Sequence, residues 1–175
     1  RLNIQKMLSF SELGVGENVL KAIQELGFIE PTPIQQQAIP VLLADETDFI
    51  GLAQTGTGKT AAFGLPILEL TDLRIPTTQA LILAPTRELC VQIANDLAKY
   101  GKFHRAANIT AVYGGANIIQ QIRQIKKGSQ IVVATPGRLL DLINRGAIDM
   151  GEIRYLILDE ADEMLNMGFV DDIET

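Results

Sequence analysis

The stretch AQTGTGKT at 53–60 carries residue types suited to binding a phosphate. It places two glycines shortly before Lys59 and Thr60. Glycines let backbone N–H groups turn toward a phosphate, a lysine reaches the outer phosphates, and a threonine hydroxyl suits Mg²⁺. The usual P-loop formula has a glycine where this chain has Ala53. A plain glycine-rich turn is the alternative, but it does not account for Lys-Thr at this offset, so the sequence favours a nucleotide-binding loop.

The stretch DEAD at 159–162 carries the second set of chemical groups, at the end of an apolar run. Acidic residues in the first turn of a helix are common because they complement the helix dipole, so a solvated helix start is the alternative. Phosphoryl transfer, however, needs a carboxylate near Mg²⁺ and a group that orients the attacking water. With a P-loop upstream, we expect Asp159 and Thr60 to hold Mg²⁺, partly through water, and Glu160 to polarise the water. The candidate catalytic residues are Lys59, Asp159 and Glu160.

The elements that must position these groups alternate along the chain. Apolar runs predict strands at 48–53, 80–84, 109–113, 130–134 and 154–158. Helical patterns follow at 59–71, 86–102, 116–127, 136–145 and from 162 onward, after two earlier helices at 19–26 and from Thr32. Nearly continuous apolar strands are typical of a parallel sheet covered on both faces. The sequence therefore predicts an α/β fold with a mostly parallel sheet flanked by helices on both faces.

Each predicted strand is followed by an unusual loop. In an open parallel sheet, ligands bind beyond the carboxyl ends of the strands. The loops are AQTGTGKT, PTREL at 85–89, GG at 114–115, TPGR at 135–138 and DEAD. We expect all five to share one edge of the sheet.

Composition narrows the class of protein. The 175 residues are 47% hydrophobic, which suits one domain with a sizeable core. The single cysteine, Cys90, excludes disulfide frameworks and zinc sites and is expected to be a small buried hydrophobe. His104 is expected on a surface loop without a catalytic role.

No signal-peptide pattern or membrane-length apolar run occurs, so a cytoplasmic protein is expected. The net charge of −6 means that any nucleic-acid site must be local.

Together these motifs resemble the DEAD-box ATP-dependent RNA helicases, in that family's order and at similar intervals. The stretch GFIEPTPIQ at 27–35 looks like the family's Q motif, and Phe10 stands at the family's interval upstream of Gly27. The stretches LDEADEMLNMGF and TPGRLLDLINRG look most like bacterial cold-shock and ribosome-assembly helicases.

The resemblance implies a domain plan and an activity. Residues 1–175 would be the first RecA-like P-loop domain, with a Q-motif region at 1–47 and a P-loop core at 48–175. The chain would end soon after DEAD, with the second RecA-like domain absent. The parent enzyme would couple RNA-stimulated ATP hydrolysis to local unwinding of RNA duplexes. Its partners would be ATP or ADP, Mg²⁺, the RNA backbone irrespective of sequence, and the second domain, with no membrane. Because that domain supplies the arginine fingers, we expect these 175 residues alone to bind nucleotide weakly and not to turn it over appreciably.

The resemblance also assigns roles to matching residues. Gln35 would pair with the adenine edge and Phe10 would pack on the ring. The alternatives are that Gln35 caps the helix starting at Thr32 and that Phe10 is a core residue. The ATP-binding set is Phe10, Gln35, Thr55, Gly56, Thr57, Gly58, Lys59 and Thr60.

An RNA track is implied as well, made of Pro85, Thr86, Arg87, Gly114, Gly115, Thr135, Pro136, Gly137 and Arg138. Thr86 and Thr135 also suit helix N-caps, and Arg87 could instead form a structural salt bridge. Ala161 and Asp162 would couple the ATP site to the rest of the enzyme. Three rival functions remain: a DNA helicase or translocase, a non-enzymatic RNA-binding or scaffold protein, and a P-loop ATPase acting on protein partners.

Overall fold

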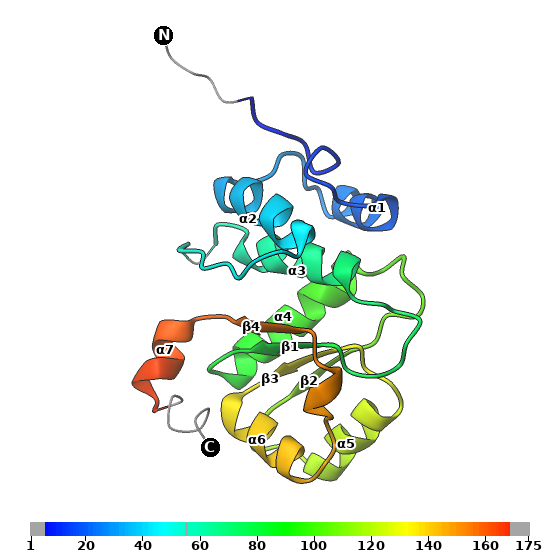
Figure 1. The fold of residues 1–175 in the computed structure, drawn as a ribbon, viewed down its shortest axis with the longest axis vertical. Coiled ribbons are helices and arrows are strands. Elements are labelled where there is room, and N and C mark those ends of the chain that lie inside the picture. Colours follow the sequence, from blue (N-terminus) through cyan, green and yellow to red (C-terminus); the bar gives the residue numbers. More distant parts are fainter. Residues whose placement is uncertain (1–5, 55, 169–175) are drawn as a thin grey trace. The chain divides into compact units, whose positions relative to one another are not determined.

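The computed structural model describes residues 6–54 and 56–168 and divides into two compact units. The first unit contains Arg1–Leu70 and Lys99–Arg105, and the second contains Thr71–Ala98 and Ala106–Thr175. Figure 1 shows the order of the elements along the chain.

The first unit is helical in its described part. It contains α1 (Glu17–Glu25), α2 (Pro33–Ala44) and α3 (Lys59–Leu70). Most of its buried side chains are aliphatic, among them Val19, Ile23, Ile39, Leu65 and Leu68. The two helices predicted before the first strand are therefore confirmed, and the third starts at the lysine of the glycine-rich loop.

Gly27 directly follows the predicted helix at 19–26 and ends α1. Its φ of +84° is left-handed, a conformation that glycine adopts without a steric penalty. The Phe28 N–H donates to the Ile23 carbonyl at 3.0 Å, and the Gly27 N–H donates to the Gln24 carbonyl at 3.0 Å. This pair of bonds is the Schellman motif, which satisfies the last carbonyls of the helix.

The second unit is built around a parallel sheet. Its strands are β1 (Ala80–Leu83), β2 (Ile109–Val112), β3 (Ile131–Ala134) and β4 (Tyr155–Leu158), in the spatial order β2-β3-β1-β4. All three pairings are parallel. Four of the five predicted strands are thus confirmed.

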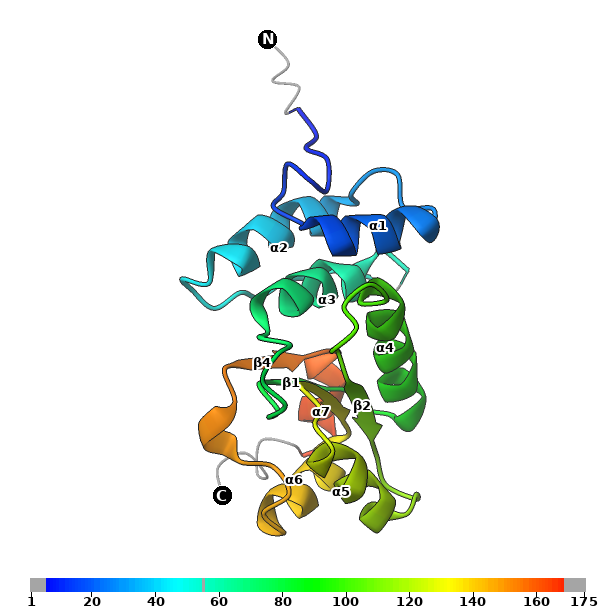
Figure 2. The ribbon, with the colours of Figure 1, turned by 90° about the vertical axis from the view of Figure 1, so that its right-hand side faces the viewer.

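Helices cover both faces of this sheet, as Figures 1 and 2 show. α4 (Arg87–Tyr100) lies on one face, and α5 (Ile118–Lys126) and α6 (Pro136–Asn144) lie on the other. A short 3₁₀ helix, η1 (Met150–Glu152), precedes β4, and α7 (Ala161–Asn166) follows it. The core on the α5–α6 face joins strand residues to helix residues, including Leu81, Val132, Ile125, Leu142 and Met164. The predicted fold class is confirmed.

The predicted strand at 48–53 is wrong for this structure. Residues 48–53 have no regular secondary structure, and the side chains of Ile50 and Leu52 are 91% and 95% exposed. A strand exists only where a neighbouring strand accepts its backbone hydrogen bonds. The described residues of the first unit include no other strand, so the apolar run has no partner within that unit.

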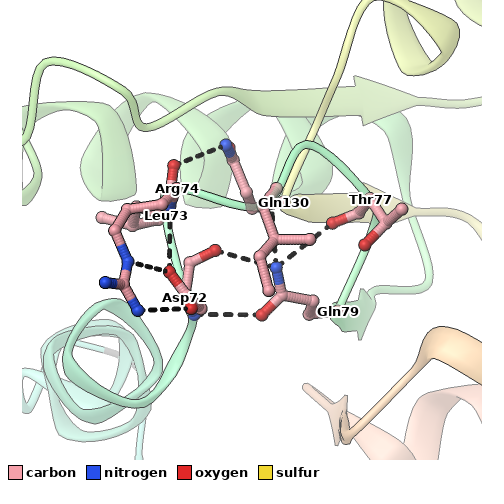
Figure 3. Close-up of polar contacts among 7 residues, drawn as sticks. Asp72, Leu73, Arg74, Thr77, Gln79 and Gln130 are labelled. Carbon is pink, nitrogen blue, oxygen red and sulfur yellow. Dashed lines mark hydrogen bonds and ion pairs between the residues drawn. The ribbon is translucent and has the colours of Figure 1, made fainter.

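A polar network holds the connection from α3 to β1, next to the amino ends of β1 and β3 (Figure 3). Gln79 is buried, and its Nε2 donates to the Asp72 carbonyl at 2.8 Å while its Oε1 accepts from the Asp72 N–H at 3.0 Å. Gln130, also buried, donates through Nε2 to the Leu73 carbonyl at 3.1 Å and to the Ala106 carbonyl at 3.0 Å. Two glutamines therefore supply the hydrogen bonds that loop backbone cannot make with itself.

Cys90 is fully buried in α4, as predicted, and burial raises the pKa of its thiol to about 12. His104 lies between two turns, outside regular secondary structure, and is partly exposed. Within residues 6–54 and 56–168, none of the helices combines the length and the apolar character needed to span a bilayer.

Candidate functional site

Two glycines of the glycine-rich loop have a left-handed backbone. Gly56 and Gly58 have φ values of +81° and +78°, a region that side-chain-bearing residues rarely adopt. The Thr57 hydroxyl donates to the Gln54 carbonyl at 2.6 Å, and α3 begins at Lys59. The first N–H groups of α3 therefore follow directly on a tight turn, which is the arrangement that binds anions. Thr55 lies outside the described residues.

Gln35 joins the start of α2 to this loop. Its Oε1 accepts from the Thr32 N–H at 2.9 Å, and its Nε2 donates to the Gly58 carbonyl at 3.0 Å. The predicted cap is thus formed by Gln35, while the Thr32 hydroxyl has no hydrogen-bond partner among the described residues. A Cβ built on Gly58 would lie 2.3 Å from the Gln35 Nε2, so this contact needs a glycine.

The Gln35 amide still has hydrogen-bonding capacity after these two contacts. A side-chain amide has two N–H donors and two acceptor lone pairs. One N–H and one lone pair are used by Gly58 and Thr32, and one of each remains. That remaining pair matches the N7 acceptor and N6 donor of adenine. Helix capping and adenine pairing are therefore compatible for this one side chain.

Phe10 is a core residue in this structure. Its side chain is 4% exposed, and its ring centroid lies 6.0 Å from that of Phe28. This burial fits the alternative of core packing. Packing on adenine stays a prediction. The sequence did not single out Gln36, whose side-chain amide donates to the Leu8 carbonyl and accepts from the Leu8 N–H at 3.3 Å, holding the segment before Phe10 against α2.

The carboxylates of DEAD stand at the end of β4. The Asp159 N–H continues the sheet ladder by donating to the Leu83 carbonyl at 2.9 Å, and the Asp159 side chain is 4% exposed. Glu160 has a left-handed backbone with φ +53° and is the N-cap residue of α7. Its N–H donates to Asp159 Oδ1 at 3.1 Å. The apolar strand thus delivers a buried carboxylate, and a strained residue turns the chain into α7, where Ala161 and Asp162 form the first turn.

Four of the five predicted loops follow strands of one parallel sheet, so their starts lie at the same edge. These loops begin at Pro85, Gly114, Thr135 and Asp159. The remaining loop, AQTGTGKT, belongs to the first unit, and its place at this edge stays a prediction.

Helix capping at this edge differs between the two threonines. The Thr86 hydroxyl accepts from the Leu89 N–H at 3.2 Å, so its capping role is confirmed. Thr135 occupies the N-cap position of α6, with Pro136 at the first helical position, but its side chain makes no capping hydrogen bond. Gly137 is exposed, as are Gly114 and Gly115. The exposed backbone and hydroxyl groups here are of the kind that contacts phosphate and sugar in nucleic-acid complexes.

Two arginines complete the edge. The guanidinium of Arg87 lies over the ring of Tyr113, with its carbon 4.7 Å from the ring centroid. Among the described residues Arg87 forms no ion pair, so the structural salt bridge considered for it is absent. Arg138 donates from Nη1 to the Ala116 carbonyl at 3.2 Å and to Gln121 Oε1 at 2.9 Å.

Gln121 is not among the site residues predicted from the sequence. Its signal was a glutamine on the apolar face of an amphipathic helix, since Ile118, Ile122 and Ile125 lie on that same face of α5. A polar residue on such a face is often merely tolerated, and only its hydrogen bonds to Tyr113 and Arg138 distinguish Gln121 from that case.

The predicted magnesium ligands have suitable chemistry. Mg²⁺ prefers oxygen ligands and usually takes only one or two from the protein, with waters and substrate phosphates supplying the rest. The Thr60 hydroxyl and the Asp159 carboxylate are ligands of this kind, and Asp159 is a buried carboxylate directly after a strand. Among the described residues no group of three or more His, Cys, Asp or Glu side chains could hold a metal without such help. The chemistry of these two side chains suits an ion whose other ligands are waters and nucleotide phosphates.

A parallel sheet with helices on both faces, a glycine-rich loop before a helix and an acidic turn after an apolar strand are features that P-loop proteins share. The family model for the DEAD/DEAH box helicases matches residues 32–175. This chain belongs to that family.

Individual relatives agree with this assignment. The chain is 53% identical over 169 residues to the ATP-dependent RNA helicase CshA of Listeria monocytogenes, covering 97% of this chain and 32% of the relative. It is 49% identical to the ATP-dependent RNA helicase DeaD of Haemophilus influenzae, covering 96% and 27%. A crystal structure of a DEAD box protein from Methanococcus jannaschii superposes with a TM-score of 0.90 at 46% identity, covering 97% of this chain and 46% of that one. The chain thus spans about a third of the length of the curated relatives it matches.

Proposed function

We propose that this chain is the N-terminal RecA-like domain of a cytoplasmic, RNA-stimulated ATPase that separates short RNA duplexes. Residues 1–47 form its Q-motif region and residues 48–175 its P-loop core, and a second RecA-like domain completes the enzyme. The observation that carries the proposal is the contact between Gln35 and Gly58. It joins the side chain that pairs with adenine to the loop that binds phosphate. The base and the phosphates of one ATP molecule can therefore bind to neighbouring groups of the chain.

Different groups of the chain bind the adenine, the phosphates and the metal ion of ATP. The spare donor and acceptor of Gln35 pair with the adenine edge. The amides of the loop, with Gly56 and Gly58 at its turns, hold the phosphates, and Lys59 reaches the outermost two. Thr60 and Asp159 hold the magnesium ion that accompanies ATP, partly through water. When bound, this ion neutralises charge on the phosphates.

Hydrolysis needs a group that orients the attacking water. Glu160 has this role, because it is a carboxylate next to the buried Asp159 and it caps a short helix in a strained conformation. Ala161 and Asp162, in the first turn of α7, would transmit the state of the ATP site to the rest of the enzyme.

RNA lies along the edge formed by Pro85–Arg87, Gly114–Gly115 and Thr135–Arg138. These segments offer exposed backbone, hydroxyls and two guanidinium groups. Such contacts read phosphate and the 2′-hydroxyl rather than base edges, which accounts for RNA preference without sequence preference. They also need no basic surface, consistent with the net charge of −6.

The test is RNA-stimulated ATP hydrolysis by the full-length protein. Glu160→Gln should lower the stimulated rate by about 10²- to 10⁴-fold, because the water loses its orienting carboxylate. Glu163→Gln is the matched control, since Glu163 is an exposed acid in the same helix. The control should turn over ATP like the wild type, and both variants should bind nucleotide.

Three outcomes would reject the proposal in favour of its rivals. Unchanged turnover in Glu160→Gln would leave a non-enzymatic RNA-binding protein. Stimulation by single-stranded DNA as strong as by RNA would indicate a DNA translocase. No response to any nucleic acid would leave a P-loop ATPase acting on proteins. The 175 residues alone should show weak nucleotide binding, no appreciable turnover and no unwinding, and robust stimulated hydrolysis by them would contradict the two-domain mechanism.

A further inference from the structure

Gln121 is a buried polar side chain that none of the sequence motifs includes. It lies in α5 with 6% of its surface exposed, on the face that carries Ile118, Ile122 and Ile125. Burying an amide among aliphatic side chains is unfavourable unless the amide is hydrogen-bonded. Both ends of this amide are, and their partners belong to two different loops of the proposed RNA edge.

The two ends of the amide hold the turn after β2 and the start of α6. Gln121 Nε2 donates to the Tyr113 carbonyl at 3.3 Å, and Gln121 Oε1 accepts from Arg138 Nη1 at 2.9 Å. The same Arg138 nitrogen donates to the Ala116 carbonyl at 3.2 Å. The turn that contains Gly114 and Gly115 is therefore held at both of its ends.

This arrangement leaves one edge of the Arg138 guanidinium available. The two hydrogens of Nη1 are used by Ala116 and Gln121. Among the described residues, no hydrogen bond involves Arg138 Nε or Nη2, and the side chain is partly exposed. The Nε–Nη2 edge is a planar fork that matches two oxygens of a phosphate. By occupying Nη1, Gln121 fixes the plane in which that fork points.

The same glutamine acts on the second arginine through Tyr113. The ring of Tyr113 carries the guanidinium of Arg87 at 4.7 Å, and the carbonyl of Tyr113 is the group that Gln121 holds. A single buried side chain thus links Arg87, the glycine turn and Arg138.

We propose that Gln121 is a positioning residue for the RNA backbone, which it never touches itself. It holds Arg138 and the turn between Tyr113 and Ala116 in the arrangement that receives consecutive phosphates. This inference rests on the proposed function, since it assigns the support of the same RNA edge.

The first experiment compares Gln121→Met with Gln120→Met in the full-length protein. Methionine keeps the length of the side chain but removes both hydrogen bonds, and Gln120 is an exposed neighbour in the same helix. In Gln121→Met, the RNA concentration for half-maximal ATPase stimulation should rise about tenfold, as expected for losing a hydrogen bond to a charged group. The maximal rate at saturating RNA should change less than twofold, and Gln120→Met should match the wild type in both values. An unchanged half-maximal concentration in a folded Gln121→Met protein would overturn the inference, and so would a loss confined to the maximal rate.

A second variant approaches the contact from its other side and remains informative if Gln121→Met does not fold. Arg138→Lys keeps the positive charge but loses the planar fork held by Gln121 and Ala116. It should weaken single-stranded RNA binding about tenfold, measured by fluorescence anisotropy with a non-hydrolysable ATP analogue. Adding Gln121→Met to Arg138→Lys should cost less than the tenfold that Gln121→Met costs alone, because the contact between these two side chains is already lost and only the contact with Tyr113 remains to be removed. Wild-type affinity in Arg138→Lys would overturn the inference, as would losses that multiply in the double variant.

Removing the arginines separates this inference from the proposed function. If Arg87→Ala and Arg138→Ala both leave RNA affinity unchanged, the proposed RNA edge is wrong and the inference fails with it. If both weaken RNA binding while Gln121→Met does not, only the positioning role of Gln121 is wrong.

Discussion

Glu160 combines a chemical role with an unfavourable backbone conformation. Its φ of +53° and ψ of +49° are left-handed, which costs a residue with a Cβ about 1–2 kcal/mol. Among the described residues, the only other non-glycine residue with positive φ is Asp45. A glycine would fit the turn better, so the sequence keeps a carboxylate here at the expense of stability. This is expected where a functional group must be held at a fixed place.

A glycine at this position should therefore stabilise the chain while removing the proposed function. We expect Glu160→Gly to raise the free energy of unfolding by up to about 1 kcal/mol, or about 2–4 °C in Tm for a chain of this size. Glu163→Gly, within the same helix, should instead lower it by about 1 kcal/mol. Thermal and urea unfolding of the 175-residue chain measure both. A lower Tm in Glu160→Gly would mean that the strain is offset by contacts of the carboxylate.

At the scale of elements, the connection between α3 and β1 is held by polar groups rather than by apolar packing. Arg74 donates from Nε to Asp72 Oδ1 and from Nη2 to Asp72 Oδ2, each at 2.9 Å. The Arg74 backbone N–H also donates to Oδ1 at 3.1 Å. These bonds lower the pKa of the Asp72 carboxyl from its ordinary 3.8 to about 2, the side-chain bonds contributing most.

The lowered pKa predicts how this connection responds to acid. Because the folded pKa lies below the unfolded one, the carboxylate stabilises the fold above about pH 4, and its contribution is lost as the pH falls toward 2. The stability difference between wild type and Asp72→Asn should therefore shrink over that window, as measured by urea unfolding at pH 5, 4 and 3. In Arg74→Gln, the Asp72 carboxyl should titrate closer to 3.8 by carbon-detected NMR. A difference that stays constant from pH 5 to 3 would contradict the assignment.

At the scale of the whole chain, the charge of −6 limits how nucleic acid can bind. A protein that relies on a basic surface releases many counterions, and its affinity falls steeply with salt. The edge described above offers two guanidinium groups, Arg87 and Arg138, together with uncharged backbone and hydroxyl groups. Uncharged contacts release no counterions, so most of the binding energy should be insensitive to salt.

The salt dependence of RNA binding tests this expectation directly. For single-stranded RNA, each phosphate contact made by a cation contributes about −0.7 to the slope of log K against log salt. Arg87→Gln should therefore make the slope of the full-length protein shallower by about 0.7, and Arg87→Gln with Arg138→Gln by about 1.4. Arg123→Gln is the control, since Arg123 is exposed in α5 away from the loops of the edge, and it should leave the slope unchanged. Equal slopes in all variants would place the phosphate contacts elsewhere.

Local features of the chain were predictable because their causes lie close in sequence. Gly27 ends α1 because the last turn of the helix requires a left-handed φ at this position, which glycine adopts easily. This requirement involves only residues of the same turn. The cap between Thr32 and Gln35 spans three residues, and the carboxylates at 159–162 follow an apolar run that reads as a strand by itself. The order of the motifs likewise sufficed to indicate the family.

What the sequence alone determined is the series of elements, the loops that carry the chemistry and the family they resemble. The tertiary structure decided which strands have partners, leaving 48–53 without one, and that Phe10 is covered by Phe28. It also decided that Gln121 and Gln130 are structural hydrogen-bonding centres. Gln121 joins the Tyr113 carbonyl to the Arg138 side chain, and Gln130 joins the carbonyls of Leu73 and Ala106. Periodicity and capping report on neighbours within one element, whereas strand pairing and buried polar contacts depend on residues that only folding brings together.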